Sequence, residues 1–83
     1  MSETTAELKR EIQKTYGLMQ TLRDEVRVRI HLGGMDALDE WNKLEPHVLE
    51  LEDKASELTE ATRTALAKVV ERLSKLRSSL GGT

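Results

Sequence analysis

Apolar residues recur every three or four positions through the second half of the chain. The pattern runs from Leu44 to Leu80 and alternates steps of four and three as far as Val69, where a second step of four shifts it slightly. This is the heptad pattern of a helix with one apolar face. A helix over residues 46–80 would be about 50 Å long at 1.5 Å per residue. We therefore expect a long helix with coiled-coil-like heptads, which needs a partner for its apolar stripe.

A similar stripe predicts a first helix over about residues 5–32. From Leu8 to Val26 the apolar positions follow steps of four and three. Residues 26–32 then alternate apolar and polar positions, as a half-buried strand would. A single strand would have no partner in a chain that is otherwise helical, so we interpret this stretch as helix, with strand as the alternative.

Gly33 and Gly34 are the clearest break in the sequence. Glycine after a helix often adopts the left-handed conformation that closes it, so we expect a turn over residues 33–35. Asp36 can then cap the next helix. A reversal of the chain at this turn would bring the arginines of residues 23–29 close to the carboxylates of residues 39–45.

Pro46 leaves two alternatives for the part that follows this turn. Proline has no N–H group to donate, and it disfavours helix at the residue before it. The chain then forms either one kinked helix over residues 36–80, or a short helix over 36–44 that bends into a long helix over 46–80. Both alternatives place Trp41 near the bend, and residues 81–83 follow as a frayed tail.

The predicted first helix is shorter than the arm after the turn. It can cover that arm only to about residue 62, and exposing the rest of the stripe would cost about 1.5–3 kcal/mol per large side chain. We therefore expect an all-α fold, an antiparallel helical hairpin with a long bent second arm that dimerises into a four-helix-bundle-type assembly. The expected dimer interface comprises Leu58, Ala61, Thr62, Ala65, Leu66, Val69, Leu73, Leu76 and Leu80.

The distribution of charge favours an antiparallel dimer. The net charge is only −2, but residues 35–60 hold two Lys against nine Asp and Glu, whereas residues 61–83 hold five Lys and Arg against one Glu. Two long helices that cross near residue 60 would place the basic end of one on the acidic middle of the other. The ion pairs that this geometry predicts are Arg63 with Glu57, Lys68 with Glu52, and Lys75 with Glu45.

The composition offers little catalytic chemistry. The chain has no Cys, and neither His31 nor His47 follows a Glu by three positions, the spacing found in helical di-metal proteins. The sequence contains no nucleophile elbow and no phosphate-binding loop motif. We therefore expect no enzyme activity, no metal and no cofactor.

These patterns favour a non-enzymatic protein–protein interaction or oligomerisation module, a scaffold or adaptor. The expected partner is a second copy of the chain, or another helical protein that contacts Val28, Leu32 and Trp41. Val28 and Leu32 face away from the main stripe of their helix. A lone Trp is more often a core residue than a contact, but near a bend it can anchor a partner, so both interpretations of Trp41 stay open.

Two other function classes stay open as alternatives. The first is an amphipathic protein that associates with a membrane surface or with lipid. The second is association with nucleic acid through the basic C-terminal helix, which the small negative net charge disfavours. No stretch is long and apolar enough to span a membrane, and the first residues do not resemble a signal peptide, so we expect a cytoplasmic protein.

Overall fold

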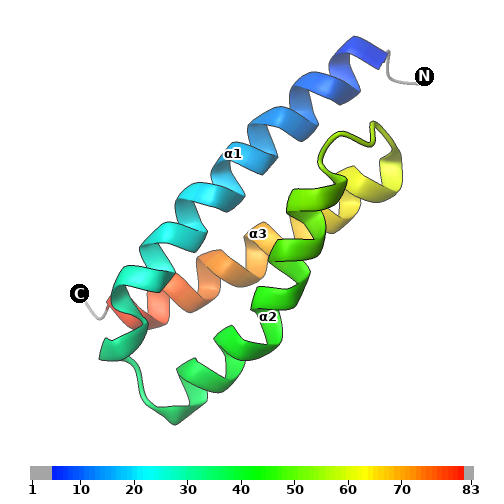
Figure 1. The fold of residues 1–83 in the computed structure, drawn as a ribbon. Helices are drawn as coiled ribbons and strands as arrows, with labels where there is room; N and C mark the ends of the chain where they lie inside the picture. The colour runs from blue at the N-terminus through cyan, green and yellow to red at the C-terminus, as the bar shows by residue number, and fades with distance from the viewer. Residues whose placement is uncertain (1–4, 82–83) are drawn as a thin grey trace.

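The computed structural model describes residues 5–81, which form a bundle of three α-helices (Figure 1). These are α1 (Thr5–Arg29), α2 (Met35–Lys54) and α3 (Glu60–Gly81), and a short 3₁₀-helix, η1 (Ile30–Leu32), follows α1. No strand occurs in this part of the chain. The all-helical prediction is therefore confirmed.

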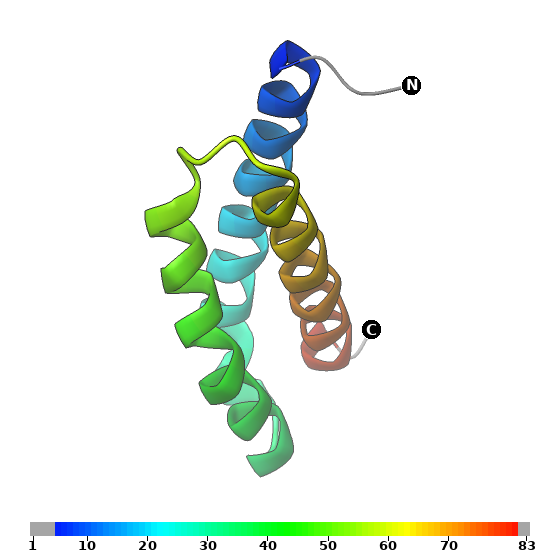
Figure 2. The ribbon, with the colours of Figure 1, turned by 90° about the vertical axis from the view of Figure 1, so that its right-hand side faces the viewer.

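Helix α3 is the centre of the packing, because it contacts both other helices extensively while α1 and α2 contact each other little. Figure 1 shows α2 crossing α3 and standing apart from α1, and Figure 2 shows α3 running along α1. Two ion pairs, Glu11–Arg63 and Glu25–Arg77, join α1 to α3 with the same sequence offset, so these two helices run parallel. Helix α2 runs antiparallel to both.

The apolar stripe of α1 packs into the core as its spacing predicts. Ile12, Met19, Leu22 and Val26 are all buried. The stretch over residues 26–32 is helical, since α1 continues to Arg29 and then tightens into η1. The helical interpretation of this ambiguous stretch is correct.

The first turn needs glycine for space and not for a left-handed backbone. Gly33 has φ −87° and Gly34 has φ −85°, so neither adopts the positive φ that we expected. A Cβ atom added at Gly33 would lie 2.6 Å from Ala37 Cβ and 2.6 Å from Leu80 Cδ2. Helix α2 and the last turn of α3 therefore close around this glycine, whereas a Cβ at Gly34 would meet nothing within 4 Å.

Helix α2 passes through Pro46 without a break and ends at Lys54. Proline removes the hydrogen bond that would be donated to the carbonyl of Asn42. Both residues are exposed, so water can satisfy that carbonyl. The predicted helix over 36–44 is therefore too short. Asp36, which we expected to cap it, lies in the first turn of α2, and the N-cap residue is Gly34.

The predicted long helix over 46–80 is wrong, because the chain turns at residues 55–59 and folds back as α3. The amide of Glu57 donates to the carbonyl of Lys54 at 2.9 Å. Thr59 Oγ1 then accepts a hydrogen bond from the amide of Thr62 at 3.1 Å, which caps α3.

This second turn lets one chain cover its own apolar stripe. The last third of the chain packs against α1 and α2, where we expected it to need a second molecule. The core contributed by α2 and α3 comprises Trp41, Leu44, Val48, Leu51, Leu66, Val69, Leu73, Leu76 and Leu80. The single chain is therefore a three-helix bundle, and the second arm of the predicted hairpin is two helices.

Candidate interaction surface

Most of the residues predicted for a dimer interface lie in the core of the single chain. Thr62 is 6 % exposed, and the apolar members from Leu66 to Leu80 are buried. Only Leu58 and Ala61 are exposed, and Ala65 is half-buried. In this fold the set is a core and not a surface, and a second molecule could reach it only if α3 left its place.

The charged residues predicted to pair between two chains have other partners within one chain. Glu45 and Glu52 pair with arginines of α1, and Arg63 pairs with carboxylates of α1 and α3. Neither Lys68 nor Glu57 forms an ion pair with another described residue. The observed pairs are Arg27–Glu45 at 3.6 Å, Arg23–Glu52, Arg63–Glu11 at 3.4 Å, Arg63–Glu60, and Lys75–Glu71 at 3.5 Å.

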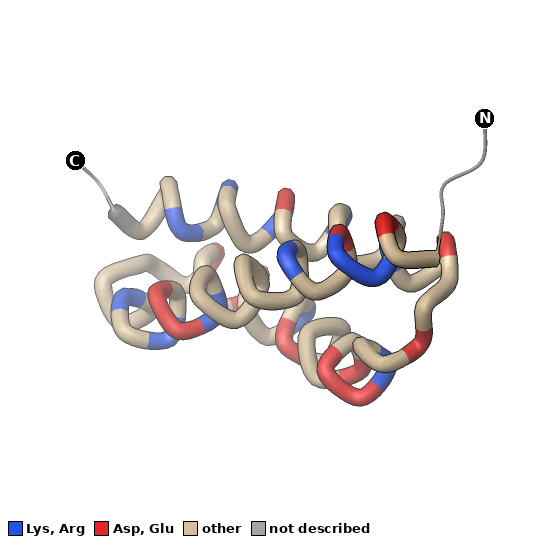
Figure 3. Tube along the Cα trace, turned by 90° about the horizontal axis from the view of Figure 1, so that it is seen from above, with Lys and Arg blue, Asp and Glu red and all other residues tan. Residues whose placement is uncertain are grey.

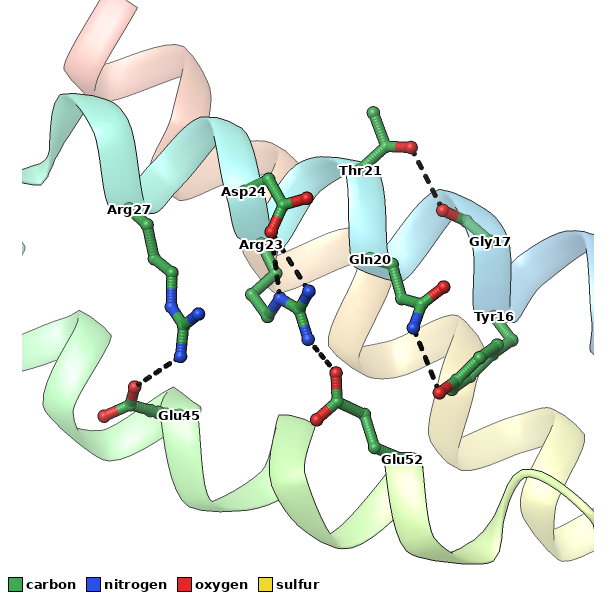
Figure 4. A network of polar contacts seen from close by, with 9 residues as sticks. All are labelled: Tyr16, Gly17, Gln20, Thr21, Arg23, Asp24, Arg27, Glu45 and Glu52. Atoms are coloured by element: carbon green, nitrogen blue, oxygen red, sulfur yellow. Dashed lines mark hydrogen bonds and ion pairs between the residues drawn. The ribbon is translucent and has the colours of Figure 1, made fainter.

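Polar side chains span the gap between α1 and α2 (Figure 4). Arg23 reaches Glu52, and its guanidinium also lies 3.0 Å from Asp24. Gln20 and Tyr16 lie about one and two turns before Arg23 on α1, and the side-chain amide of Gln20 donates to the hydroxyl of Tyr16 at 3.1 Å. The Arg23 and Glu52 side chains are each 20 % exposed, so this pair is more shielded from water than an ordinary surface pair.

The basic residues of α3 are largely matched by carboxylates of the other helices. Arg72 donates to Glu40 of α2 at 3.0 Å, and Arg77 lies 3.2 Å from Glu25 of α1. In Figure 3, Lys and Arg positions are mixed with Asp and Glu positions along the bundle. Because these charges offset each other, α3 does not present an uninterrupted basic stripe.

Three large apolar side chains are strongly exposed where α1 joins α2. Val28 is 69 % exposed, Leu32 66 % and Met35 74 %, and we call these three residues the tip patch. Val28 and Leu32 were predicted as partner contacts, whereas Met35 was assigned to the turn and missed. Trp41, the third predicted contact, is only 6 % exposed and belongs to the core, so it is not available to a partner.

A pocket of about 760 Å³ lies beside the tip patch, between the start of α2 and the end of α3. Met35 lines this pocket and is also part of the tip patch. The charged groups of its wall are two cations, Arg72 and Lys75, and two carboxylates, Asp36 and Glu40. Since these charges offset each other, the pocket favours neither an anion nor a cation, and its glycine, alanine and leucine walls suit an apolar side chain.

Within residues 5–81, no helix combines the length and hydropathy needed to cross a membrane. In the same residues, no group of three or more His, Asp and Glu side chains is arranged to hold a metal ion. Comparisons with protein-family models, with curated proteins and with solved structures gave no match.

Proposed function

We propose that the protein is a non-enzymatic interaction module, a scaffold or adaptor that docks another helical protein through the tip patch. The observation that carries this proposal is the position of the most exposed large apolar side chains. Among the described residues, the three highest exposures of such side chains fall within eight positions, at Val28, Leu32 and Met35. Scattered exposed apolar residues are ordinary, whereas a group of them beside a pocket is typical of a binding surface.

The energetics support docking at this end of the bundle. Burying one large apolar side chain contributes about 1.5–3 kcal/mol, so the tip patch can supply a substantial part of a binding free energy. The fold gains little from these side chains, because they remain mostly in contact with water. The adjacent pocket can accept an apolar anchor residue from the partner, the usual arrangement at the centre of an interface.

The test uses a photo-crosslinking amino acid placed at Leu32, with Leu49 as the control site. Leu49 is 50 % exposed, and it lies 14 residues beyond Met35 on α2, about 21 Å along the helix from the tip patch. We expect a defined protein to crosslink at position 32, and Val28→Ser with Met35→Ser to abolish that crosslink. Equal crosslinking at both positions would contradict the proposal.

The membrane-surface alternative is tested with the same variants. If the tip patch inserts into lipid instead, the unmodified chain will co-sediment with anionic vesicles at low salt and the Val28→Ser, Met35→Ser variant will not. We expect neither chain to co-sediment. Vesicle binding that depends on these two residues would replace the protein partner with a lipid surface.

A further inference from the structure

The turn between α2 and α3 contains no residue that prevents a helix. Residues 55–59 read Ala-Ser-Glu-Leu-Thr, with neither glycine nor proline. Alanine, glutamate and leucine are good helix formers, and serine and threonine cost only a few tenths of a kcal/mol each. Local preference therefore does not require the chain to turn here.

The apolar stripe also keeps its phase across this turn. At 100° per residue, the buried positions of α2 from Trp41 to Leu51 and those of α3 from Thr62 to Leu80 fall within one arc of about 100°. Ala55 and Leu58 fall in the same arc, at steps of four, three and four between Leu51 and Thr62. Two helices joined by an ordinary loop have no reason to share a phase, whereas one continuous helix does.

Straightening the turn would empty the core of a single chain. A helix over residues 35–81 would be about 70 Å long, and it would carry α3 away from both other helices. Helix α1 packs mainly on α3 and contacts α2 little, so an open chain would leave the apolar faces of α1, α2 and α3 without a cover. Such a chain is stable only if the α3 of a second molecule takes the vacant place.

We propose that this protein also exists as an antiparallel domain-swapped homodimer, formed when residues 55–59 straighten and each α3 packs against α1 and α2 of the other copy. The contacts of the closed chain then reform between chains, including the ion pairs Glu40–Arg72 and Glu25–Arg77. The two long helices cross at their hinges. Domain swapping of this kind needs no new surface, because the closed chain has already selected the interface.

The balance between the closed chain and the swapped dimer depends on the hinge. Thr59 and the Glu57–Lys54 hydrogen bond hold the closed form. In the straight form residues 55–59 gain helical hydrogen bonds, and Leu58, which is 37 % exposed in the closed chain, lies in the seam between the two crossing helices. The tip patch takes no part in this dimer. If the dimer does not form, the proposed docking of a partner is unaffected, and if no partner docks, the proposed dimer is unaffected.

A crosslink between α2 and α3 distinguishes the swapped dimer from any other dimer. The chain has no cysteine, so Glu40→Cys with Arg72→Cys supplies a unique pair at two positions whose native side chains form an ion pair between α2 and α3 in the closed chain. The variant is refolded from denaturant at millimolar concentration, its mass is measured by light scattering, and a short bismaleimide is added. We expect a fraction with the mass of two chains, whose crosslinks join different chains on a denaturing gel. A chain that stays monomeric, or a dimer whose crosslinks stay within one chain, would overturn the proposal.

Hinge variants test the same proposal without the crosslink. Thr59→Ala removes the cap of the closed turn, which should shift the equilibrium between closed and straight hinge about fivefold towards the straight form. Because each dimer has two hinges, its dissociation constant should fall about 25-fold. Glu57→Gly disfavours the straight helix by a similar factor per hinge and should raise the dissociation constant of the dimer about 25-fold. Leu58→Ser should weaken the dimer, whereas Leu49→Ser, outside the seam, should not. Equal dissociation constants for all four variants would also overturn the proposal.

Discussion

The turn between α1 and α2 closes around Gly33, whereas the turn between α2 and α3 contains neither glycine nor proline. At the first turn, a single added methyl group would collide with Ala37 and Leu80. At the second turn, the local structure is a capping hydroxyl at Thr59 and one backbone hydrogen bond of Glu57. The first turn is therefore specified by a glycine and by the close packing around it, and the second mainly by the burial of α3 against the rest of the bundle.

This difference separates two ways in which a chain can reverse direction. A turn that is built from glycine and close packing keeps its geometry as long as its neighbours, here Ala37 and Leu80, stay in place or are replaced by the same residues of another chain. A turn that depends on distant apolar contacts can open wherever the same contacts are available from another molecule. Four pairs of variants compare the two turns and the contacts between the helices, and we give them in order of decreasing expected effect on the free energy of unfolding.

The largest effect is expected from Leu80→Ala. Leu80 is 5 % exposed and packs against Gly33, so its truncation leaves a cavity beside the first turn and should cost about 2–5 kcal/mol. Leu58→Ala at the second turn is the matched control, and it should cost less than about 1 kcal/mol because Leu58 is already partly exposed. Urea unfolding followed by circular dichroism measures both, and equal costs would remove the distinction between the turns.

Serine substitutions at the two neighbouring glycines should have opposite effects. Gly33→Ser places a side chain against Ala37 and Leu80 and should destabilise the fold by about 1–3 kcal/mol. Gly34→Ser meets open space, and because Gly34 is the N-cap of α2 with an extended backbone, the hydroxyl should stabilise the helix by about 0.5 kcal/mol. We expect the denaturant midpoint of Gly33→Ser to lie below that of the unmodified chain and the midpoint of Gly34→Ser to lie above it. Two losses of similar size would contradict the packing argument.

Thr59→Ala should destabilise the closed chain by about 1 kcal/mol, since the amide of Thr62 loses its acceptor. The control is Thr64→Ala, an exposed position on α3 where the change should stay within about 0.5 kcal/mol. Unfolding is measured at low micromolar concentration so that only the single chain is present. If Thr59→Ala proves as neutral as Thr64→Ala, the second turn has no local support.

The smallest effect concerns the ion pairs between α1 and α2. Arg27→Gln should cost at most about 0.5 kcal/mol, because the Arg27 and Glu45 side chains are 51 % and 37 % exposed. Arg23→Gln should cost more, about 1 kcal/mol, because it leaves the shielded carboxylate of Glu52 without its partner. Thermal melts at low and high salt compare the two, and a larger loss from Arg27→Gln would contradict this order.

The elements with local signals were predictable from the sequence. The stripe of α1 predicted its buried face, and the two glycines predicted the first turn. The antiparallel reversal predicted only that arginines of residues 23–29 approach carboxylates of residues 39–45, and Arg27–Glu45 is a pair of this kind. The reason given for the glycines, a left-handed backbone, was wrong, and the actual reason could not be predicted because the distance from Gly33 to Leu80 depends on where α3 packs. A contact between residues 47 positions apart leaves no trace in the local pattern.

The second turn and the binding surface were not predictable in the same way. The heptads continue from Leu51 through Leu58 to Thr62, so every local signal favoured one long helix, and only the gain from burying α3 within the chain selects the turn. Met35 was missed because a residue directly after two glycines belongs to no apolar period. For Trp41 the sequence left a core position and a partner contact open, and its burial in one cluster with the apolar residues of α3 shows that it is a core residue.

The most direct test of the difference between the turns is a distance between spin labels on α2 and α3. Asp36→Cys and Ser79→Cys place the labels at two exposed positions that line the same pocket in the closed chain. In a straight helix these positions would be about 65 Å apart. With labelled chains diluted into an excess of unlabelled chain, we predict a single short distance for the monomer and a distance of about 65 Å for the dimer fraction. A dimer fraction that retains only the short distance would contradict the account.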